Sequence, residues 1–241
     1  MDYELMMNGN VKIGMKAPDF EAQSTMGNIS LTNYIGKWII LFSHPGDFTP
    51  VCTTEIIAFA NADSYFKERN ACLIGLSVDS NSSHLAWIYD IYLRTGIKIP
   101  FPIISDRNGT IARKYGMISN DISNTQTVRN VYIIDPEGLI RLILIYPMNI
   151  GRCIPEILRA LEALQISDQC KGSTPANWIL GNPIIRPIPQ TYRELEKTAE
   201  MVKNEKNGMS WYLNFKKTQD CIQNPIKSKE IKKLEDKKNK K

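Results

Sequence analysis

The sequence lacks a long apolar run at its start, where Asp2 and Glu4 interrupt the first residues. Such a start does not resemble a secretory signal peptide, and no later window is apolar enough to span a membrane. Internal repeats are missing as well. These absences predict a soluble protein of the cytoplasm with no membrane partner.

Paired cysteines are also missing. The cysteines are odd in number, and none stands in a C-x-x-C pair or another spacing typical of metal ligands. We therefore predict no metal site, and in a reducing cell we expect every cysteine to be a thiol. The five are Cys52, Cys72, Cys153, Cys170 and Cys221.

An excess of charge of one sign is missing from the body of the chain. The net charge is +5, and residues 227–241 hold eight lysines against three acidic residues, a surplus that accounts for all of it. No basic face with interleaved aromatic residues is evident in residues 1–226. We therefore expect no nucleic-acid partner, and a solvated or frayed helical tail at residues 226–241.

What the sequence does contain is an alternation of short apolar runs with longer segments of helical period, which is typical of an α/β sheet with helices on its faces. Strands are expected over residues 38–43, 72–79, 100–105 and, as a hairpin, 129–147; helices are expected over 53–68, 82–96, 110–117 and 155–165. In the first of these helices, the spacing of Ile56, Ile57, Ala60 and Tyr65 predicts the face that packs on the sheet.

The alternation ends near Lys171, where a segment rich in proline and glycine begins. We therefore place a domain boundary there. Residues 1–170 are predicted to form the α/β domain, residues 171–225 a small C-terminal module, and residues 226–241 the Lys-rich tail.

Cys52 lies in the segment FSHPGDFTPVCTTE, where a strand and a loop precede a helix that Pro50 helps to start. In the first turn of a helix, unpaired N–H groups and the helix dipole favour the thiolate form of a cysteine. Inert free cysteines are usually buried among apolar residues, but the neighbours of Cys52 are polar. Cys72 and Cys153 lie in or beside apolar elements and are predicted to be core positions. Cys52 is therefore the candidate for chemistry.

Thioredoxin-like proteins place a cysteine at the same kind of junction, but dithiol exchange needs a second cysteine at C-x-x-C. Here Thr49 occupies the position of that partner. A single thiol with a hydroxyl beside it cannot close a local disulfide. The pattern therefore favours one activated thiolate that attacks an electrophile.

The segment HPGDFTPVCTTE resembles the peroxidatic loop of the peroxiredoxins, and His44 together with the long C-terminal extension resembles the one-cysteine subfamily. The similarity runs from about Gly14 to about Lys217 and includes TVRNVYIID, IYPMNIGR and TPANW. It implies a thioredoxin-like fold with a small C-terminal extension domain used for dimerisation. It also implies reduction of hydrogen peroxide and organic hydroperoxides through a cysteine sulfenic acid, with no cofactor and with an external thiol reductant.

The resemblance also assigns roles to individual residues. Cys52 is the implied peroxidatic cysteine, Thr49 the hydroxyl that binds the peroxide, and Pro45 the ring that shields the site. Arg129 is implied to lie against the thiolate, with Glu55 holding it in place. His44 and Arg152 are implied to lie near the substrate pocket. The extension of one subunit is implied to reach its partner in a homodimer. The sequence does not decide whether dimers assemble into a higher oligomer.

Two alternatives come from other classes. A phospholipase, as described for some members of the subfamily, needs a serine nucleophile and an upstream histidine, but Lys37 and Leu31 stand near those positions. A peroxide sensor or holdase would use the same thiol, and the sequence leaves that alternative open because sensing also begins with a sulfenic acid.

The oxidised thiol must be reduced by an external thiol or by another cysteine of the protein. Cys170 lies at the domain boundary, with no reason to face the pocket. Cys221 lies in the extension and is the candidate resolving cysteine, but it stands close to the charged tail and beyond the segments similar to the family. We therefore predict an external reductant, with resolution by Cys221 as the alternative.

Overall fold

The structure is a computed structural model, and it describes residues 11–119, 121–205 and 208–221. The Lys-rich tail predicted at residues 226–241 lies outside the described residues. The chain divides into two compact units, residues 1–158 and residues 159–241, and each is described by itself. Within the described ranges, no helix is long and apolar enough to cross a membrane. The cytoplasmic location stays a prediction.

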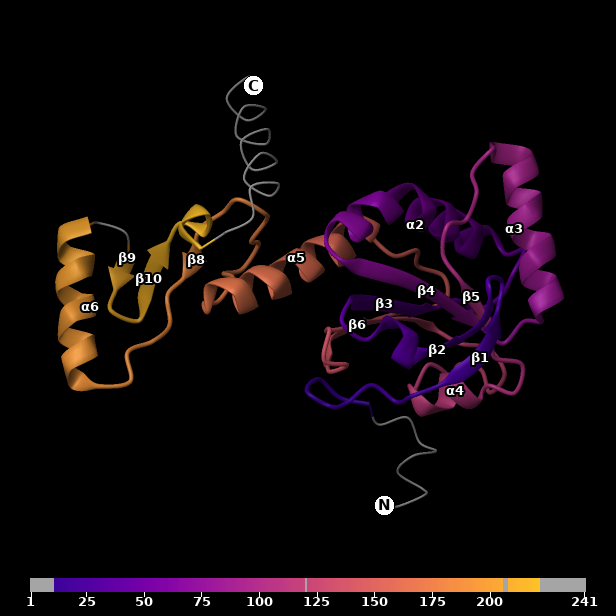
Figure 1. The fold of residues 1–241 in the computed structure, drawn as a ribbon, viewed down its shortest axis with the longest axis horizontal. Coiled ribbons are helices and arrows are strands. Elements are labelled where there is room, and N and C mark those ends of the chain that lie inside the picture. The colour runs from indigo at the N-terminus through magenta and orange to yellow at the C-terminus, as the bar shows by residue number, and fades with distance from the viewer. Residues whose placement is uncertain (1–10, 120, 206–207, 222–241) are drawn as a thin grey trace, which may run out of the picture. The chain divides into compact units, whose positions relative to one another are not determined.

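The first unit is built on a seven-stranded sheet with the strand order β2-β1-β5-β4-β3-β6-β7 (Figure 1). The pairs β3–β4 and β4–β5 are parallel, and the other pairs of neighbouring strands are antiparallel. Their bounds are β1 Glu21–Ser24, β2 Gly27–Ser30, β3 Trp38–Ser43, β4 Ala71–Ser77, β5 Ile103–Ser105, β6 Arg129–Ile134 and β7 Ile140–Tyr146. The predicted α/β architecture and the predicted hairpin are confirmed.

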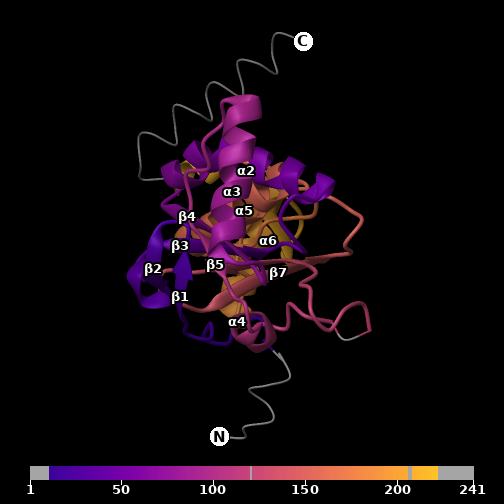
Figure 2. The ribbon, with the colours of Figure 1, turned by 90° about the vertical axis from the view of Figure 1, so that its right-hand side faces the viewer.

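Helices lie on both faces of this sheet. Their bounds are η1 Leu31–Tyr34, α2 Pro50–Glu68, α3 Asn81–Thr95 and α4 Thr110–Lys114. Figures 1 and 2 show α2 on one face and α4 on the opposite face. Every residue of β3 is buried, because a central strand of such a sheet is covered on both faces. Phe42 of β3 stacks on Phe59 of α2 with ring centroids 4.1 Å apart, whereas Leu41 joins the cluster that includes Ile111 of α4.

The helix α2 begins at Pro50, three residues before the expected range of 53–68, and Thr49 is the residue before it. The predicted part of Pro50 in starting the helix is confirmed. Cys52 therefore lies in the first turn. The predicted buried face is only partly right: Ile56 is buried, but Tyr65 is 52% exposed and Phe59 takes its place in the core. The polar residue Glu55 also lies on the buried face, which shifts that face around the helix.

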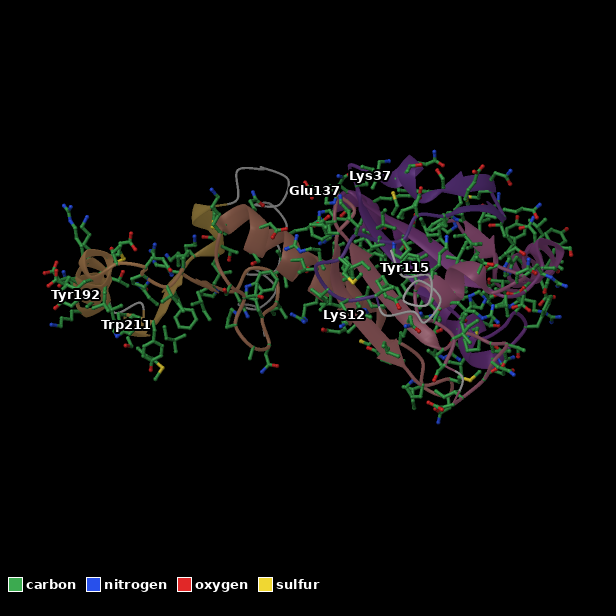
Figure 3. The ribbon with its side chains drawn as sticks, turned by 90° about the horizontal axis from the view of Figure 1, so that it is seen from below. Lys12, Lys37, Tyr115, Glu137, Tyr192 and Trp211 are labelled. Carbon is green, nitrogen blue, oxygen red and sulfur yellow. A yellow bond between two sulfur atoms is a disulfide. The ribbon has the colours of Figure 1, made fainter. Side chains whose placement is uncertain are left out.

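The second unit contains the second half of α5 (Ile154–Cys170), a three-stranded sheet and α6. The sheet has the order β8-β10-β9, and the bounds are β8 Ile184–Ile185, α6 Tyr192–Glu205, β9 Gly208–Ser210, β10 Leu213–Lys216 and η2 Thr218–Asp220. Ile166 and Cys170 of α5 form a buried cluster with Trp178 and Ile184. This packing explains why the division falls inside α5, before the predicted boundary near Lys171. Figure 3 shows the labelled side chains of Tyr192 and Trp211 on this unit.

Two of the five cysteines are joined by a disulfide, which contradicts the prediction that all are thiols. The bond links Cys170 and Cys221, whose Cα atoms are 5.3 Å apart although 51 positions separate them in sequence. The two meet because β10, shortly before Cys221, pairs with β8, which packs on the end of α5. Tertiary pairing of this kind leaves no local spacing signal.

The predicted core positions of Cys72 and Cys153 also need correction. Cys72 is half-buried and Cys153 is exposed, and both are free thiols. At the start of α5, Cys153 is exposed between buried Arg152 and buried Ile154. Burial raises the pKa of the Cys72 thiol, so this cysteine is a poor source of thiolate.

Candidate active site

Cys52 is fully buried in the first turn of α2 and contacts one charged group through its sulfur. Arg129 Nη1 donates a hydrogen bond to Cys52 Sγ over 3.3 Å. The two residues are 77 positions apart, and they meet because β3, the strand that leads into α2, pairs with β6, which begins at Arg129. The structure therefore brings together the thiol and the arginine that the sequence singles out.

The guanidinium of Arg129 is held in one orientation. Its Nε and Nη2 donate to the carbonyl oxygen of Met148 over 2.9 and 2.6 Å, and its Nη1 also donates to Glu55 Oε2 over 2.7 Å. Fixed donors of this kind need no reorganisation when negative charge develops beside them. Arg129 is therefore preorganised to bind an anion at Cys52.

Glu55 lies one helical turn after Cys52, on the same buried face of α2. Its carboxylate accepts hydrogen bonds from Arg129 Nη1 and from the backbone N, Nε and Nη2 of Arg152, all between 2.7 and 2.8 Å. Burial opposes ionisation of this carboxyl, but the hydrogen bonds and charge of Arg152, with the charge of Arg129, outweigh burial and lower the pKa of Glu55. Glu55 is thus a buried anion between two arginines.

Arg152 is buried beneath Glu55. Its Nη1 donates to the carbonyl oxygens of Ser43 and Asn130 over 2.9 and 3.0 Å, and its guanidinium lies 5.2 Å from the ring centroid of Phe42. Each nitrogen of this guanidinium therefore has a protein acceptor. The contacts make Arg152 a residue that positions Glu55. Its sequence-predicted place near a substrate pocket stays a prediction.

The charges of this cluster do not balance by themselves. Arg129 and Arg152 carry two positive charges, Glu55 carries one negative charge, and all three side chains are at most 3% exposed. An uncompensated charge is costly in a buried site. A thiolate at Cys52 would supply the missing negative charge at hydrogen-bond distance from Arg129.

The loop before α2 carries Pro45 and Thr49, the other two residues implied to act on the peroxide. Pro45 is buried, and Thr49 Oγ1 donates to the carbonyl oxygen of Gly46 over 2.9 Å. The carbonyl oxygen of Thr49 accepts from Thr53 N over 3.0 Å, which is the first hydrogen bond of α2. Thr49 is thus fixed at the junction of loop and helix, three residues before Cys52.

Behind this loop lies a buried network that the sequence does not reveal directly. Asp47 accepts hydrogen bonds from His44 Nε2 over 3.1 Å and from His84 Nδ1 over 2.8 Å, and both histidines are fully buried. Burial alone would raise the pKa of Asp47, but the hydrogen bonds and charges of the two histidines outweigh it, so the pKa of Asp47 is lowered. Burial lowers the pKa of His44, against the attraction of Asp47. Asp47 is therefore ionised between the two rings.

His84 also faces Ile104, whose carbonyl oxygen lies 3.2 Å from His84 Nε2. Both ring nitrogens of His84 thus face protein oxygens, one of Asp47 and one of Ile104. Ligand atoms of His44, Asp47 and His84 lie within 4.8 Å of one another, and the hydrogen bonds between the residues account for this proximity. A usable signal existed in the sequence: the segments that follow the parallel strands 38–43 and 72–79 meet at one edge of the sheet.

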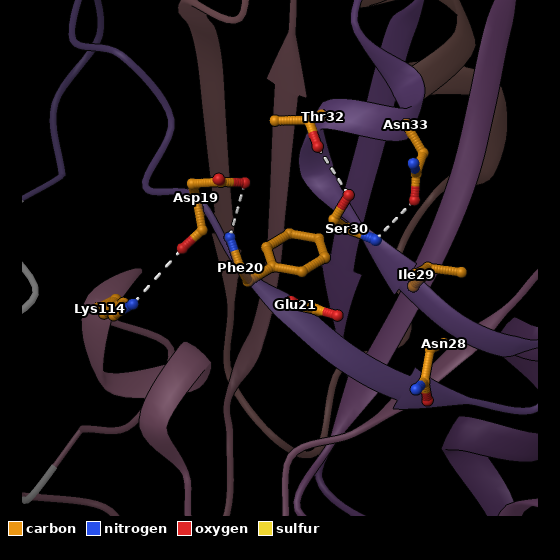
Figure 4. Close-up of a pocket in the computed structure, with 9 residues that line it drawn as sticks. All are labelled: Asp19, Phe20, Glu21, Asn28, Ile29, Ser30, Thr32, Asn33 and Lys114. Carbon is orange, nitrogen blue, oxygen red and sulfur yellow. Dashed lines mark hydrogen bonds between the residues drawn. The ribbon is translucent and has the colours of Figure 1, made fainter.

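A separate hollow of about 490 Å³ lies on the first unit and contains none of these residues (Figure 4). Its polar groups bind one another: Asp19 O accepts from Lys114 Nζ over 3.4 Å, and Ser30 N donates to Asn33 Oδ1 over 2.8 Å. Cys52 and the cluster of Arg129, Glu55 and Arg152 therefore remain the candidate active site.

Comparisons with known proteins show the family of the chain. Residues 13–143 match the AhpC/TSA family. Peroxiredoxin 2 of Caldanaerobacter subterraneus subsp. tengcongensis is 55% identical over 206 residues, covering 86% of this chain and 93% of the relative. A peroxiredoxin of Thermoplasma volcanium is 49% identical and covers 86% of this chain and 99% of the relative.

Solved structures show the same relationship. Peroxiredoxin 6 of Arenicola marina, in a cysteine-to-serine mutant, aligns with a TM-score of 0.76 and 34% identity over 87% of this chain and 99% of that chain. A yeast mitochondrial 1-Cys peroxiredoxin aligns with a TM-score of 0.72 and 38% identity over 86% of this chain and 99% of that chain. These likenesses confirm the thioredoxin-like fold. The chain therefore belongs to the AhpC/TSA family and is a peroxiredoxin, a thiol-dependent peroxidase.

Proposed function

We propose that Cys52 is the peroxidatic cysteine and that it reduces hydrogen peroxide and organic hydroperoxides through a sulfenic acid. The observation that carries this proposal is the 3.3 Å hydrogen bond from Arg129 Nη1 to Cys52 Sγ in the first turn of α2. Cys72 and Cys153, the other free cysteines, have no such partner among the hydrogen bonds and ion pairs of the described residues. Cys52 alone among the free thiols has a buried cation against its sulfur.

The chemistry is a two-electron oxidation of sulfur. The Cys52 thiolate attacks one oxygen of the peroxide, the O–O bond breaks, and the leaving oxygen takes a proton to become water or an alcohol. The sulfur keeps the transferred oxygen as a sulfenic acid. Negative charge moves from sulfur to the leaving oxygen, so groups that bind both positions lower the barrier more than groups that bind the thiolate alone.

Arg129 and Thr49 are the groups that we assign to this task. Arg129 Nη1 is already directed at the sulfur, and Glu55 with Met148 keeps it there. The Thr49 hydroxyl donates to Gly46, which leaves its oxygen lone pairs to accept a hydrogen bond from a hydroperoxide. Pro45, buried in the same loop, shields the site from water, and His44 lies behind it.

In this proposal an external thiol reduces the sulfenic acid, as the resemblance to the one-cysteine subfamily implies. The engagement of Cys221 with Cys170 supports this, because a sulfur already in a disulfide cannot attack a sulfenic acid. A related solved structure is described as showing thiol resolution in a yeast 1-Cys peroxiredoxin through the glutathione and thioredoxin systems. Family membership as an enzyme does not favour the sensor or holdase alternative.

We also propose a homodimer. Several large hydrophobic side chains lie exposed on the C-terminal unit, and Trp211 and Tyr212 among them are in contact, as is common at an interaction surface. They are Tyr192, Met209, Trp211 and Tyr212, and Met209 is 83% exposed. Sedimentation of the full chain should give the mass of a dimer or of a multiple of it, and a monomer at micromolar concentration would contradict this assignment.

The test of the catalytic proposal compares single cysteine variants. Peroxide consumption is followed with excess small-molecule thiol for the wild type, Cys52→Ser and Cys153→Ser. Cys52→Ser should lose turnover because its hydroxyl is not ionised near neutral pH, while Cys153→Ser, which removes an exposed thiol, should keep it. After one equivalent of peroxide, a 1,3-diketone probe should label residue 52 as a sulfenic acid. Substantial turnover by Cys52→Ser would refute the assignment.

A further inference from the structure

Cys170 and Cys221 form a second sulfur centre, separate from Cys52. Both lie in the C-terminal unit. Cys170 ends α5 and is 4% exposed among Ile166, Trp178 and Ile184, whereas Cys221 is half-buried and packs against the outside of the same cluster. Cys170 is thus the more enclosed residue of the disulfide, and Cys221 is the more accessible one.

The disulfide encloses the whole small sheet of this unit. The loop between Cys170 and Cys221 contains β8, α6, β9 and β10. Beyond β10, polar contacts also hold the chain: Thr218 Oγ1 donates to Asn182 O over 2.7 Å, and Gln169 Nε2 donates to Cys221 O over 3.3 Å. The disulfide is the covalent tie that fixes Cys221 against α5.

The unequal burial of the two sulfurs determines how such a bond opens. A thiolate attacks the sulfur that it can reach, which here is that of Cys221, and the sulfur of Cys170 leaves and takes up a proton. The second thiol of a dithiol reductant then displaces Cys221 as a free thiol. Two electrons pass from the dithiol, which becomes a disulfide, to the protein, which gains two thiols. Peroxide reverses the change, because two thiols and one hydrogen peroxide give one disulfide and two waters.

We propose that Cys170 and Cys221 form a reversible redox clip, a thiol–disulfide site that accepts electrons from a dithiol reductant. When it is closed, the clip holds the end of the C-terminal unit and withholds Cys221 from the oxidised Cys52. The claim that the clip withholds Cys221 rests on the proposed function of Cys52, whereas the claim that it holds the end of the C-terminal unit does not. The clip therefore keeps the enzyme in one-cysteine chemistry while oxidised, and its reduction releases a thiol in the segment that precedes the Lys-rich tail.

The first test is made in the Cys52→Ser background, so that its outcome is independent of the peroxidase mechanism. Protein purified without reductant is alkylated, digested with trypsin and measured by mass. The peptides of residues 160–171 and 218–227, which hold Cys170 and Cys221, should appear as one linked species that a dithiol separates. Cys153→Ser serves as the control, because it removes a thiol outside the clip. Recovery of both peptides mainly as alkylated thiols would overturn the clip.

The second test measures what the clip holds. Backbone hydrogen exchange of residues 213–221 should be at least about tenfold faster in the wild type after dithiol treatment. The same increase should appear in untreated Cys221→Ser, because in both cases this segment loses its covalent bond to α5. Cys221 is half-buried, so this variant leaves the core in place; Cys170→Ala repeats the comparison from the buried side. Unchanged exchange in both variants would show that the bond holds nothing.

The third test concerns the withheld thiol. Wild type with a closed clip should give Cys52 oxides after one equivalent of peroxide, and Cys221→Ser should keep turnover with a monothiol reductant within about twofold of the wild type. A Cys52 to Cys221 disulfide as the main product in the wild type would overturn the withholding role. Activity in Cys52→Ser would instead refute the proposed function while leaving the linked peptides of the first test unchanged.

Discussion

Replacement of Glu55 by glutamine tests the charge balance of the active site. The substitution keeps the shape of the side chain but removes the anion that lies between Arg129 and Arg152. The carboxylate accepts four hydrogen bonds of 2.7 to 2.8 Å from these two residues, and it is 2% exposed. An amide offers one acceptor oxygen and directs two N–H donors at guanidinium donors. The variant thus removes the carboxylate charge that lies between two buried cations.

The expected magnitude follows from breaking a buried pair, which costs about 3 to 5 kcal/mol. With a urea slope of about 2 to 3 kcal/mol per molar for a chain of this size, the unfolding midpoint should fall by roughly 1 to 2.5 M. The matched control is Asp90→Asn, which removes one exposed partner of the Arg94 to Asp90 pair at 2.8 Å. Its midpoint should stay within error, because exposed pairs contribute little.

Urea unfolding of both variants, followed by far-ultraviolet circular dichroism at pH 7, makes the comparison. Glu55→Gln also removes the acceptor that orients Arg129 Nη1, the nitrogen that contacts Cys52, so the second-order rate with peroxide should fall about a hundredfold or more in folded protein. A midpoint for Glu55→Gln as close to the wild type as that of Asp90→Asn would refute the argument that two buried guanidinium groups need this anion.

Three further outcomes are expected. Arg129→Gln and Thr49→Val should each lower the second-order peroxide rate by about 10² when measured by stopped flow with Cys52 fully ionised, and an unchanged rate would remove both from the transition state. Asp47→Asn should have a lower urea midpoint than the wild type near pH 7. Because the pKa of Asp47 in the folded protein lies below the ordinary carboxyl value of about 4, the difference between the two midpoints should narrow only as the pH falls below that value. A difference that stays constant from pH 7 to about 3 would show that the charge of Asp47 is not the cause. Cys221→Ser should lower the free energy of unfolding of the C-terminal unit by about 4 kcal/mol, which is the loop-closure value for a separation of 51 residues. The urea dependence of hydrogen exchange in β10 measures this change. An exchange profile that does not shift would mean that packing alone closes the loop.

The parts of the fold that the sequence predicts are those with a local signal. The strand β3 is an unbroken apolar run, and α2 carries both a start signal at Pro50 and a helical spacing. The strands β1 and β2 could not be predicted in this way, because EAQS and GNIS are short and polar. They form through pairing, with Ser24 of β1 opposite Ile104 of β5, and that partner lies 80 positions away.

The same division applies to the candidate site. The loop motif around Cys52 and the resemblance that it carries lead to Arg129 and Glu55, and the structure brings these residues together. Asp47 lies in the loop motif, but its partner His84 belongs to no motif, and the two meet only because two parallel strands end at one edge of the sheet. The disulfide of Cys170 and Cys221 likewise depends on the pairing of β8 and β10, which no spacing of cysteines encodes.

The charged cluster beside Cys52 also bears on the order of events during folding. Glu55 meets Arg129 and Arg152 across 74 and 97 positions, so the cluster forms only after β6 has paired and the segment before α5 has arrived. Contacts of such long range close late, because loop entropy must be overcome first. A nascent or partly unfolded chain therefore carries an ordinary cysteine at position 52. Under the proposed function, fast reaction with peroxide requires the completed fold, and an unfinished molecule reacts more slowly with peroxide at position 52.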